Sequence, residues 1–489
     1  MIALALTLAL AAAGPVVATD DGPVRGEADR AGAVFRGIPY AAPPVGTRRW
    51  RAPVRPARWT APRDTVAEHA ACPQTMSGEW NRRAAETGNE DCLFLDIRTP
   101  RLAADAKLPV MVWIHGGSNR AGSGGGTVES RITDQGILLV SIQYRLGALG
   151  FMSHPALTRE QGGASGNYGL MDQRAALDWV RRNIAAFGGD PARVTIAGES
   201  AGAQDVGLHR LAPASQALFA RAIAESGTPG FGVPPRSLRQ NEVVGTIIAR
   251  KAGLPDQASA AALRGLPVAR LLAADKDAAV PGLADASFIW LQAVVDGRFL
   301  REAPAAALAA GRFHRGPLLI GVNAKELTLH GGLPAAADTV RREFGTGAGR
   351  ALAFYGLQPG GTPIDDPRLG DVTLQLANDL TFRCPTIAIS ATNAARGVPV
   401  FQYQFDYAPP GGSVSHASEL ASVFALPAPG APPVAHYWLN FVKTGDPNGA
   451  GLPRWPAYDV KTRAYLSFGQ TQTTARADLR PICALRSVP

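Results

Sequence analysis

Residues 194–202 read VTIAGESAG, so a short apolar run leads directly into Gly198-Glu199-Ser200-Ala201-Gly202. The run Val194–Ala197 is predicted to be a buried strand, and the residues after the pentapeptide can form a helix. Glycines on both sides of Ser200 permit the tight, strained turn that lifts a serine hydroxyl out of a sheet. Gly-x-Ser-x-Gly alone is a common pattern, but its strand, turn and helix context favours a nucleophilic serine over a serine that caps a helix.

Other apolar runs repeat this pattern along the chain. Runs of this length that are rich in β-branched residues and end in glycine or polar residues are typical of buried strands. They are Pro109–Ile114, Ile137–Tyr144, Ala222–Ala224 and Leu318–Val322. An amphipathic helix is predicted between two strands, where apolar residues recur at helical spacing: Leu177, Val180, Ile184 and Phe187. This alternation predicts an α/β fold with a mostly parallel central sheet and helices on both faces.

The composition is typical of a large globular protein. Of 489 residues, 46% are hydrophobic and 18% are charged, which excludes a disordered chain and a bundle of membrane spans. No internal repeat and no Gly/Ser linker divides the chain, so we expect a single domain over residues 19–489. The net charge is +9, but the densest basic stretch, residues 48–58, is broken by Pro53 and Pro56. Nucleic-acid binding is therefore not expected.

The first 18 residues are predicted to be a signal peptide. Residues 2–13, IALALTLALAAA, have the length of a secretory apolar core, and the small residues Val16–Ala18 follow. The run is too short for a stable membrane span. Because no Lys or Arg precedes it, an atypical signal, an upstream start codon and a plain apolar terminus remain alternatives. We expect an exported protein, secreted or periplasmic.

Four cysteines, an even number, agree with an oxidising compartment. They are Cys72, Cys92, Cys384 and Cys483. Four cysteines allow three connectivities, and spacing alone favours a short loop between Cys72 and Cys92. None lies within a short metal-ligand spacing of another cysteine, so we expect neither a cysteine nucleophile nor a metal site.

A second glycine-rich turn follows the predicted strand Pro109–Ile114. It reads His115-Gly116-Gly117-Ser118, and its glycines free backbone NH groups to point at an oxygen that gains negative charge. We expect an oxyanion hole formed by the NH groups of Gly117 and Ser118 together with that of Ala201. His115 is expected to shape this loop and not to act as a base.

The turns at Ser200 and at His115–Ser118, together with segments over most of the chain, resemble those of the type B carboxylesterases, which are cholinesterase-like α/β-hydrolases. Many matches in the right order are more specific than any single motif. The segments that look like family signatures are Phe35–Ala41, Glu90–Leu93, Gly166–Gln173, Asn183-Ile184, Phe187–Pro191, Gly198–Gly202, Gly445–Asn448 and Trp455–Tyr458. The resemblance implies the α/β-hydrolase fold and hydrolysis of small carboxylic esters without a cofactor.

The resemblance also implies a catalytic triad in the chain order serine, acid, histidine. Gly321–Glu326 looks like the segment Gly-x-Asn-x-x-Glu that carries the family's acid, which makes Glu326 the acid. Lys325 and Leu327 flank it where the family commonly has Asp and Gly. A surface ion pair between Lys325 and Glu326 is the alternative.

For the base, the segment Ser415–Leu420 resembles the family's His-x-x-Glu segment and implies His416. Composition alone does not choose among His416, His436, His330 and His314. The resemblance further implies the disulfides Cys72–Cys92 and Cys384–Cys483.

The sequence therefore predicts a serine carboxylesterase. Ser200 attacks the acyl carbonyl, His416 takes its proton, and Glu326 orients the imidazole. The alternatives are a non-catalytic binding or adhesion domain of the same fold, a lipase, and a choline esterase. Retention of all three residues argues against the first alternative, and the oligomeric state is left open.

Three residues bear on the substrate. Trp80 lies between Cys72 and Cys92 and resembles in placement the aromatic residue with which cholinesterases hold a quaternary ammonium. Packing of the disulfide loop is its competing role. Asn119 and Arg120 follow the Gly-Gly segment where the family often has an aromatic residue, which predicts a more polar mouth. We expect esters with short to medium acyl chains and weak choline-ester turnover.

Overall fold

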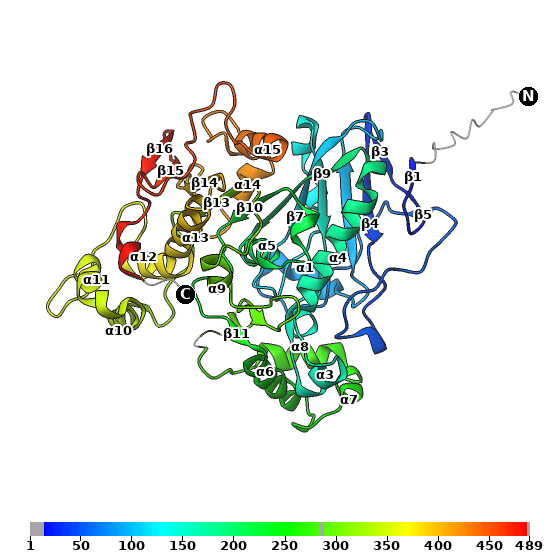
Figure 1. Ribbon diagram of the computed structural model, residues 1–489, viewed down its shortest axis with the longest axis horizontal. Coiled ribbons are helices and arrows are strands. Elements are labelled where there is room, and N and C mark those ends of the chain that lie inside the picture. Colours follow the sequence, from blue (N-terminus) through cyan, green and yellow to red (C-terminus); the bar gives the residue numbers. More distant parts are fainter. Residues whose placement is uncertain (1–13, 284, 286–287, 487–489) are drawn as a thin grey trace, which may run out of the picture.

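The computed structural model describes residues 14–283, 285 and 288–486, and its centre is a mixed sheet of eleven strands (Figure 1). In order across the sheet the strands are β16 (Thr473–Ala477), β15 (Ala464–Phe468), β14 (Val400–Phe405), β13 (Leu318–Asn323), β10 (Arg221–Glu225), β9 (Gly189–Glu199), β7 (Leu108–Ile114), β8 (Leu138–Ile142), β6 (Phe94–Thr99), β4 (Gly32–Pro39) and β3 (Glu27–Asp29). Every pairing between β15 and β8 is parallel. The pairings at both edges are antiparallel. The prediction of a mostly parallel sheet is confirmed.

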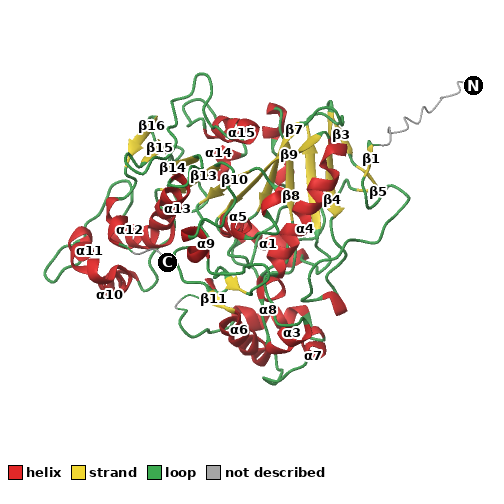
Figure 2. Cartoon of the chain, viewed as in Figure 1, coloured by secondary structure: helices red, strands yellow, loops and turns green. Residues whose placement is uncertain are grey.

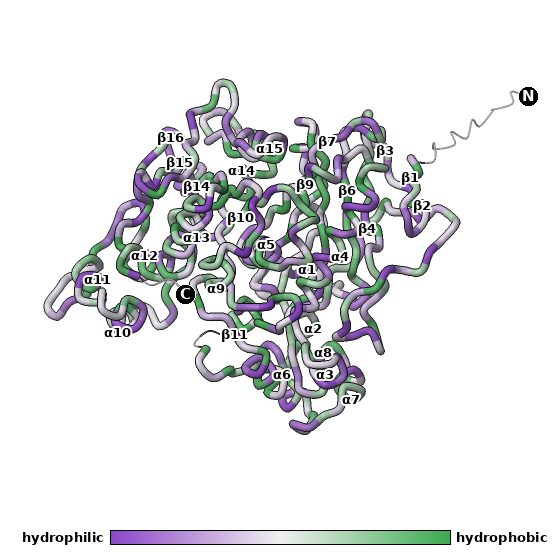
Figure 3. Tube along the Cα trace, in the orientation of Figure 1, coloured by the Kyte–Doolittle hydropathy of each residue, from purple (hydrophilic) through white to green (hydrophobic). Residues whose placement is uncertain are grey.

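All five strands predicted from the sequence lie in this sheet, as β7, β8, β9, β10 and β13. Each has apolar residues on both faces. In β7, Val110, Val112 and Ile114 join one core, whereas Met111 and Trp113 join another. Figure 3 shows hydrophobic residues following the central strands. Burial on both faces explains why these strands are continuous apolar runs without a polar alternation.

Helices cover both faces of the sheet, as predicted (Figure 2). On one face lie α4 (Tyr168–Asn183) and α5 (Ala201–Leu211), which pack Leu177, Val180 and Val206 into the first core. On the other face lie α14 (Leu420–Val423) and α15 (Val434–Thr444), whose Trp438 and Phe441 belong to the second core.

Smaller elements surround this centre (Figure 1). The remaining helices are α1 (Arg82–Thr87), α2 (Gly147–Phe151), α3 (Pro155–Glu160), α6 (Leu238–Lys251), α7 (Ala260–Arg264), α8 (Val268–Lys276), α9 (Pro304–Ala309), α10 (Gly332–Phe344), α11 (Ala348–Tyr355), α12 (Val372–Asn378) and α13 (Cys384–Ala394). A π-helical turn, Asp379–Arg383, joins α12 to α13. Two small sheets contain β1 (Val16–Ala18), β2 (Pro23–Arg25), β5 (Arg63–Asp64), β11 (Arg236–Ser237) and β12 (Val294–Val295).

The apolar run of the predicted signal peptide, residues 2–13, lies outside the described residues. Its predicted last residues, Val16–Ala18, form β1 and pair antiparallel with β2. In the part of the chain that the structure describes, no helix is long and apolar enough to span a membrane.

Two disulfides join Cys72 to Cys92 and Cys384 to Cys483, which are the pairs that the resemblance implies. The first closes the loop that contains α1. The second ties the start of α13 to the C-terminal 3-10 turn Pro481–Leu485. Their sequence separations are 20 and 99 residues.

These separations predict unequal contributions to stability. Because loop-closure entropy grows with loop length, losing Cys384–Cys483 should lower the free energy of unfolding by about 1.4 kcal/mol more than losing Cys72–Cys92. Urea unfolding of the Cys384→Ser/Cys483→Ser and Cys72→Ser/Cys92→Ser double variants checks this order. A larger loss in the variant without the short loop would contradict it.

Candidate active site

Ser200 lies in the turn between β9 and α5, with φ of +54° and ψ of −122°. This backbone conformation is unfavourable for a residue with a side chain. Its NH donates to the Glu225 carbonyl over 2.8 Å. A Cβ on Gly202 would lie 2.1 Å from the carbonyl oxygen of Ile114, so only glycine permits this approach of α5 to β7. The turn lifts the serine to the edge where the parallel strands end.

His416 and Glu326 complete a hydrogen-bonded chain with Ser200. His416 Nε2 lies 2.8 Å from Ser200 Oγ, and His416 Nδ1 lies 2.7 Å from Glu326 Oε2. The other oxygen of Glu326 accepts from the Asn323 NH (2.6 Å) and the Ser226 hydroxyl (2.8 Å). These partners of Glu326 do not include Lys325, so the alternative of a Lys325–Glu326 ion pair is not formed. The structure brings together Ser200, Glu326 and His416, the three residues that the motifs suggested.

Three further buried carboxyl groups surround this chain, and the sequence analysis gave them no role. Glu199 Oε1 lies 3.2 Å from His416 Nε2, and Glu419 Oε2 accepts from Asn323 Nδ2 over 2.7 Å. Burial raises the pKa of Glu199 to about 8 and that of Glu419 to about 7, and it raises the pKa of Glu225 well above its usual value. The sequence did contain a signal for two of them, because Glu199 lies inside Gly198–Gly202 and Glu419 lies inside Ser415–Leu420.

These carboxylates control the charge of His416. Burial alone would lower the pKa of His416, but the negative charges of Glu199 and Glu326 outweigh burial and raise it above the usual histidine value. Phe382, on the π-helical turn, packs against the imidazole with ring centroids 5.4 Å apart. The histidine is thus held between a carboxylate cluster and an aromatic ring.

Residues 115–122, which we call the Gly-Gly loop, follow β7 and turn back beside Ser200. Gly117, Ser118 and Asn119 have φ of +99°, +59° and +55°. Within the described part of the chain, the NH groups of Gly117, Ser118 and Ala201 donate to no protein acceptor. They are therefore available to a bound oxygen.

The buried side chain of His115 supports the Gly-Gly loop from the protein interior. Its Nδ1 lies 2.9 Å from the Gly116 carbonyl oxygen, and its ring stacks on Tyr144 with centroids 4.5 Å apart. Burial lowers the pKa of His115 to about 4. A neutral, buried imidazole in these contacts supports the loop, and it takes no part in the hydrogen bonds that join Ser200, His416 and Glu326.

A cavity of about 790 Å³ opens over Ser200 and His416. One part of its wall is apolar and consists of Phe231, Phe288, Leu291, Leu327 and Phe382. Trp80, Trp113 and Asn81 also line it, and Trp80 is 64% exposed. The predicted position of Trp80 beside the site is consistent with this geometry, and most of its surface is exposed.

The expectation that Asn119 forms a polar mouth is wrong. Asn119 is 1% exposed and does not line the cavity. The left-handed turn places its side chain in the interior, where Nδ2 donates to Asp205 Oδ1 over 3.2 Å. Arg120 is also turned away and lies 3.4 Å from Asp275.

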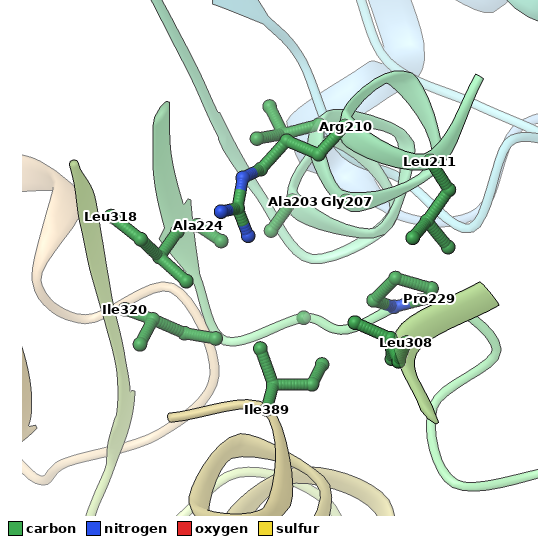
Figure 4. Close-up of a pocket in the computed structure, with 12 residues that line it drawn as sticks. Ala203, Gly207, Arg210, Leu211, Ala224, Pro229, Leu308, Leu318, Ile320 and Ile389 are labelled. Atoms are coloured by element: carbon green, nitrogen blue, oxygen red, sulfur yellow. The ribbon is translucent and has the colours of Figure 1, made fainter. Parts of the chain in front are cut away.

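A second, much smaller cavity of about 20 Å³ lies beside α5 and shares no lining residue with the first (Figure 4). Its wall is apolar apart from the Arg210 guanidinium, which donates to the His314 carbonyl and to Asn393 Oδ1. Among the described residues, no cluster of three or more His, Cys, Asp or Glu side chains has the arrangement of a metal site.

Comparison with known proteins gives consistent matches along the chain. The model of the carboxylesterase family matches residues 13–343 and 361–482. Liver carboxylesterase 1F of Rattus norvegicus is 34% identical, over 94% of this chain and 90% of its own length. Fumonisin B1 esterase of Sphingopyxis macrogoltabida is 32% identical, over 94% and 89%. The solved structure of the Geobacillus stearothermophilus carboxylesterase Est55 superposes with a TM-score of 0.79, at 32% identity, over 96% of this chain and 100% of that one.

Proposed function

The chain belongs to the carboxylesterase family, has its α/β-hydrolase fold and is a carboxylic ester hydrolase, and on this premise we propose that it works through a Ser200-His416-Glu326 triad and an acyl-enzyme intermediate. The observation that carries the proposal is the chain of short contacts from Glu326 through His416 to Ser200, at the floor of the cavity. The three unoccupied NH groups beside it support the same reaction.

In the proposed acylation, Ser200 Oγ attacks the carbonyl carbon while His416 Nε2 accepts the hydroxyl proton. Glu326 holds Nδ1–H and stabilises the imidazolium. The carbonyl oxygen becomes an oxyanion and accepts hydrogen bonds from the NH groups of Gly117, Ser118 and Ala201. The C–O bond of the ester then breaks, and His416 returns the proton to the leaving alcohol. Water repeats the sequence on the acyl-enzyme and frees the acid.

The cavity supports uncharged esters with short to medium acyl chains. Its apolar wall suits an acyl group, and its titratable lining residues are His115, Glu199, Asp285 and His416, with no Lys or Arg among the described ones. Trp80 at the rim would contact the alcohol part. A cation there would meet a protein of net charge +9, which does not attract cations over long range.

Two structural features support an exported, one-domain enzyme over residues 19–489. Both disulfides would form stably in an oxidising compartment. One sheet collects strands from β3 at residue 27 to β16 at residue 477, so the catalytic segments share a single framework.

Covalent labelling tests the nucleophile. A fluorophosphonate probe should label the wild-type protein, and Ser200→Ala should abolish labelling and lower kcat for p-nitrophenyl butyrate by at least about 10³-fold. Thermal unfolding of both proteins provides the folding control. A folded wild-type protein that stays unlabelled would instead indicate a binding or adhesion domain.

The pH profile tests the base. His416 must be neutral to accept a proton, so activity is lost as the pH falls through its raised pKa, and the acid limb of kcat/KM should lie above about pH 6.5. Glu199→Gln removes one of the charges that raise this pKa, so it should move the limb to lower pH by about one unit or more. An acid limb that stays at the same pH in Glu199→Gln would contradict the role given to Glu199 in raising the pKa of His416.

Substrate comparison tests the acyl preference. kcat/KM should be higher for p-nitrophenyl acetate or butyrate than for the palmitate ester, and low for butyrylcholine. Trp80→Ala serves as the control for a cation site, because it removes the ring without touching the triad. Preference for palmitate would indicate a lipase, and a choline preference that depends on Trp80 would indicate a choline esterase.

A further inference from the structure

The side chains of Asn119 and Asp205 connect the Gly-Gly loop to α5. Asn119 Nδ2 donates to Asp205 Oδ1 over 3.2 Å, and both residues are buried. Asp205 Oδ2 accepts from Gln173 Nε2 over 2.6 Å, so both carboxylate oxygens are engaged. The contact joins the loop that holds Gly117 and Ser118 to the helix that begins at Ala201.

Packing alone does not explain a carboxyl group at position 205. Burial raises the pKa of Asp205 to about 7, although Gln173 and Asn119 donate to it. Among the described residues, no Lys or Arg pairs with it. A buried carboxylate without a cation opposes folding. Removing it would leave Asn119 Nδ2 and Gln173 Nε2 without this acceptor, but those two hydrogen bonds do not require a carboxyl group, so its presence needs another reason.

The backbone of the loop supplies that reason. Ser118 and Asn119 are successive non-glycine residues in the left-handed region, and such a turn needs neighbours that hold it. The Asn119 carbonyl accepts from the Gly147 NH (2.6 Å), and the Tyr144 hydroxyl lies 3.2 Å from Asn119 Oδ1. Of the partners of Asn119, Asp205 is the one that belongs to α5.

We propose that Asp205 is a positioning residue for ester hydrolysis: it binds Asn119 and thereby fixes the NH groups of Gly117 and Ser118 relative to that of Ala201. This inference rests on the proposed function, in which these three groups bind one oxyanion. Since the oxyanion forms in the transition state, a misplaced loop lowers kcat more than it raises KM.

Exchange of donor and acceptor provides the test. Asn119→Asp sets two carboxyl groups against each other, and Asp205→Ala removes the acceptor. Each should lower kcat for p-nitrophenyl butyrate about 10- to 100-fold, with KM changed less than about 3-fold. The double variant Asn119→Asp/Asp205→Asn has the donor on α5 and the acceptor on the loop. It should recover kcat to within about 3-fold of wild type, a coupling that independent sites do not show.

Asp96→Ala is the matched control. Asp96 is also buried, with a pKa raised to about 7 by burial, but it lies on β6 and accepts from the Gly37 NH. Its loss should lower the unfolding temperature and leave kcat unchanged. Should Asn119→Asp not fold, Asn119→Ala replaces it under the same criteria.

The outcomes separate this inference from the proposed function. A wild-type protein that neither hydrolyses the ester nor takes the fluorophosphonate label would refute the proposed function. If the wild type is active, two results would overturn the role of Asp205. One is single variants that lose only thermal stability, as is expected of Asp96→Ala. The other is a double variant whose kcat stays as low as that of the single variants.

Discussion

The parallel pairing of β7, β9, β10, β13 and β14 is the constraint on which the site depends. Carboxyl ends of parallel strands lie at one edge of a sheet, so the loops that follow them meet there. The Gly-Gly loop follows β7, Ser200 follows β9, and Glu326 follows β13. The registers Ile114 to Gly198 and Glu225 to Gly321 set the heights of these loops. Backbone pairing thereby brings residues that are distant in sequence to within hydrogen-bond distance.

The site concentrates the unfavourable features that the rest of the fold must stabilise. Of the twelve non-glycine residues with positive φ in the described chain, six lie in or beside it. They are Ser118, Asn119, Ser200, Ser226, Phe231 and Ala417. The buried carboxyl groups of Glu199, Glu225 and Glu419 lie in the same region. Strained backbone and buried polar groups persist only where the surrounding structure compensates for them, and here the apolar cores around the sheet do so.

The sequence predicted the parts of the molecule that depend on local pattern. Buried strands such as β7 and β13 were visible as apolar runs, and glycines marked the turn at Ser200. Glu326 and His416 needed the resemblance, because nothing local in their segments shows that the sheet brings them together. The direction of the Asn119 side chain was missed because its positive φ is set by the tertiary structure, and a non-glycine residue gives no sign of it. The carboxyl cluster was missed since burial, which raises those pKa values, is a property of the folded core.

Different parts of the core support the two halves of the proposed chemistry. The NH groups of Gly117, Ser118 and Ala201 depend on the neighbouring central strands β7 and β9 and on the helix α5. Glu326 and His416 instead depend on the C-terminal elements. There α12 and the π-helical turn hold the loop that carries Glu326, since Arg383 donates to the Ala324 carbonyl and Asn378, the last residue of α12, accepts from the Leu327 NH. The disulfide Cys384–Cys483 begins at the next residue. A structural change near the C-terminus should therefore impair proton transfer by His416. A change in the Gly-Gly loop should instead weaken the stabilisation of the oxyanion.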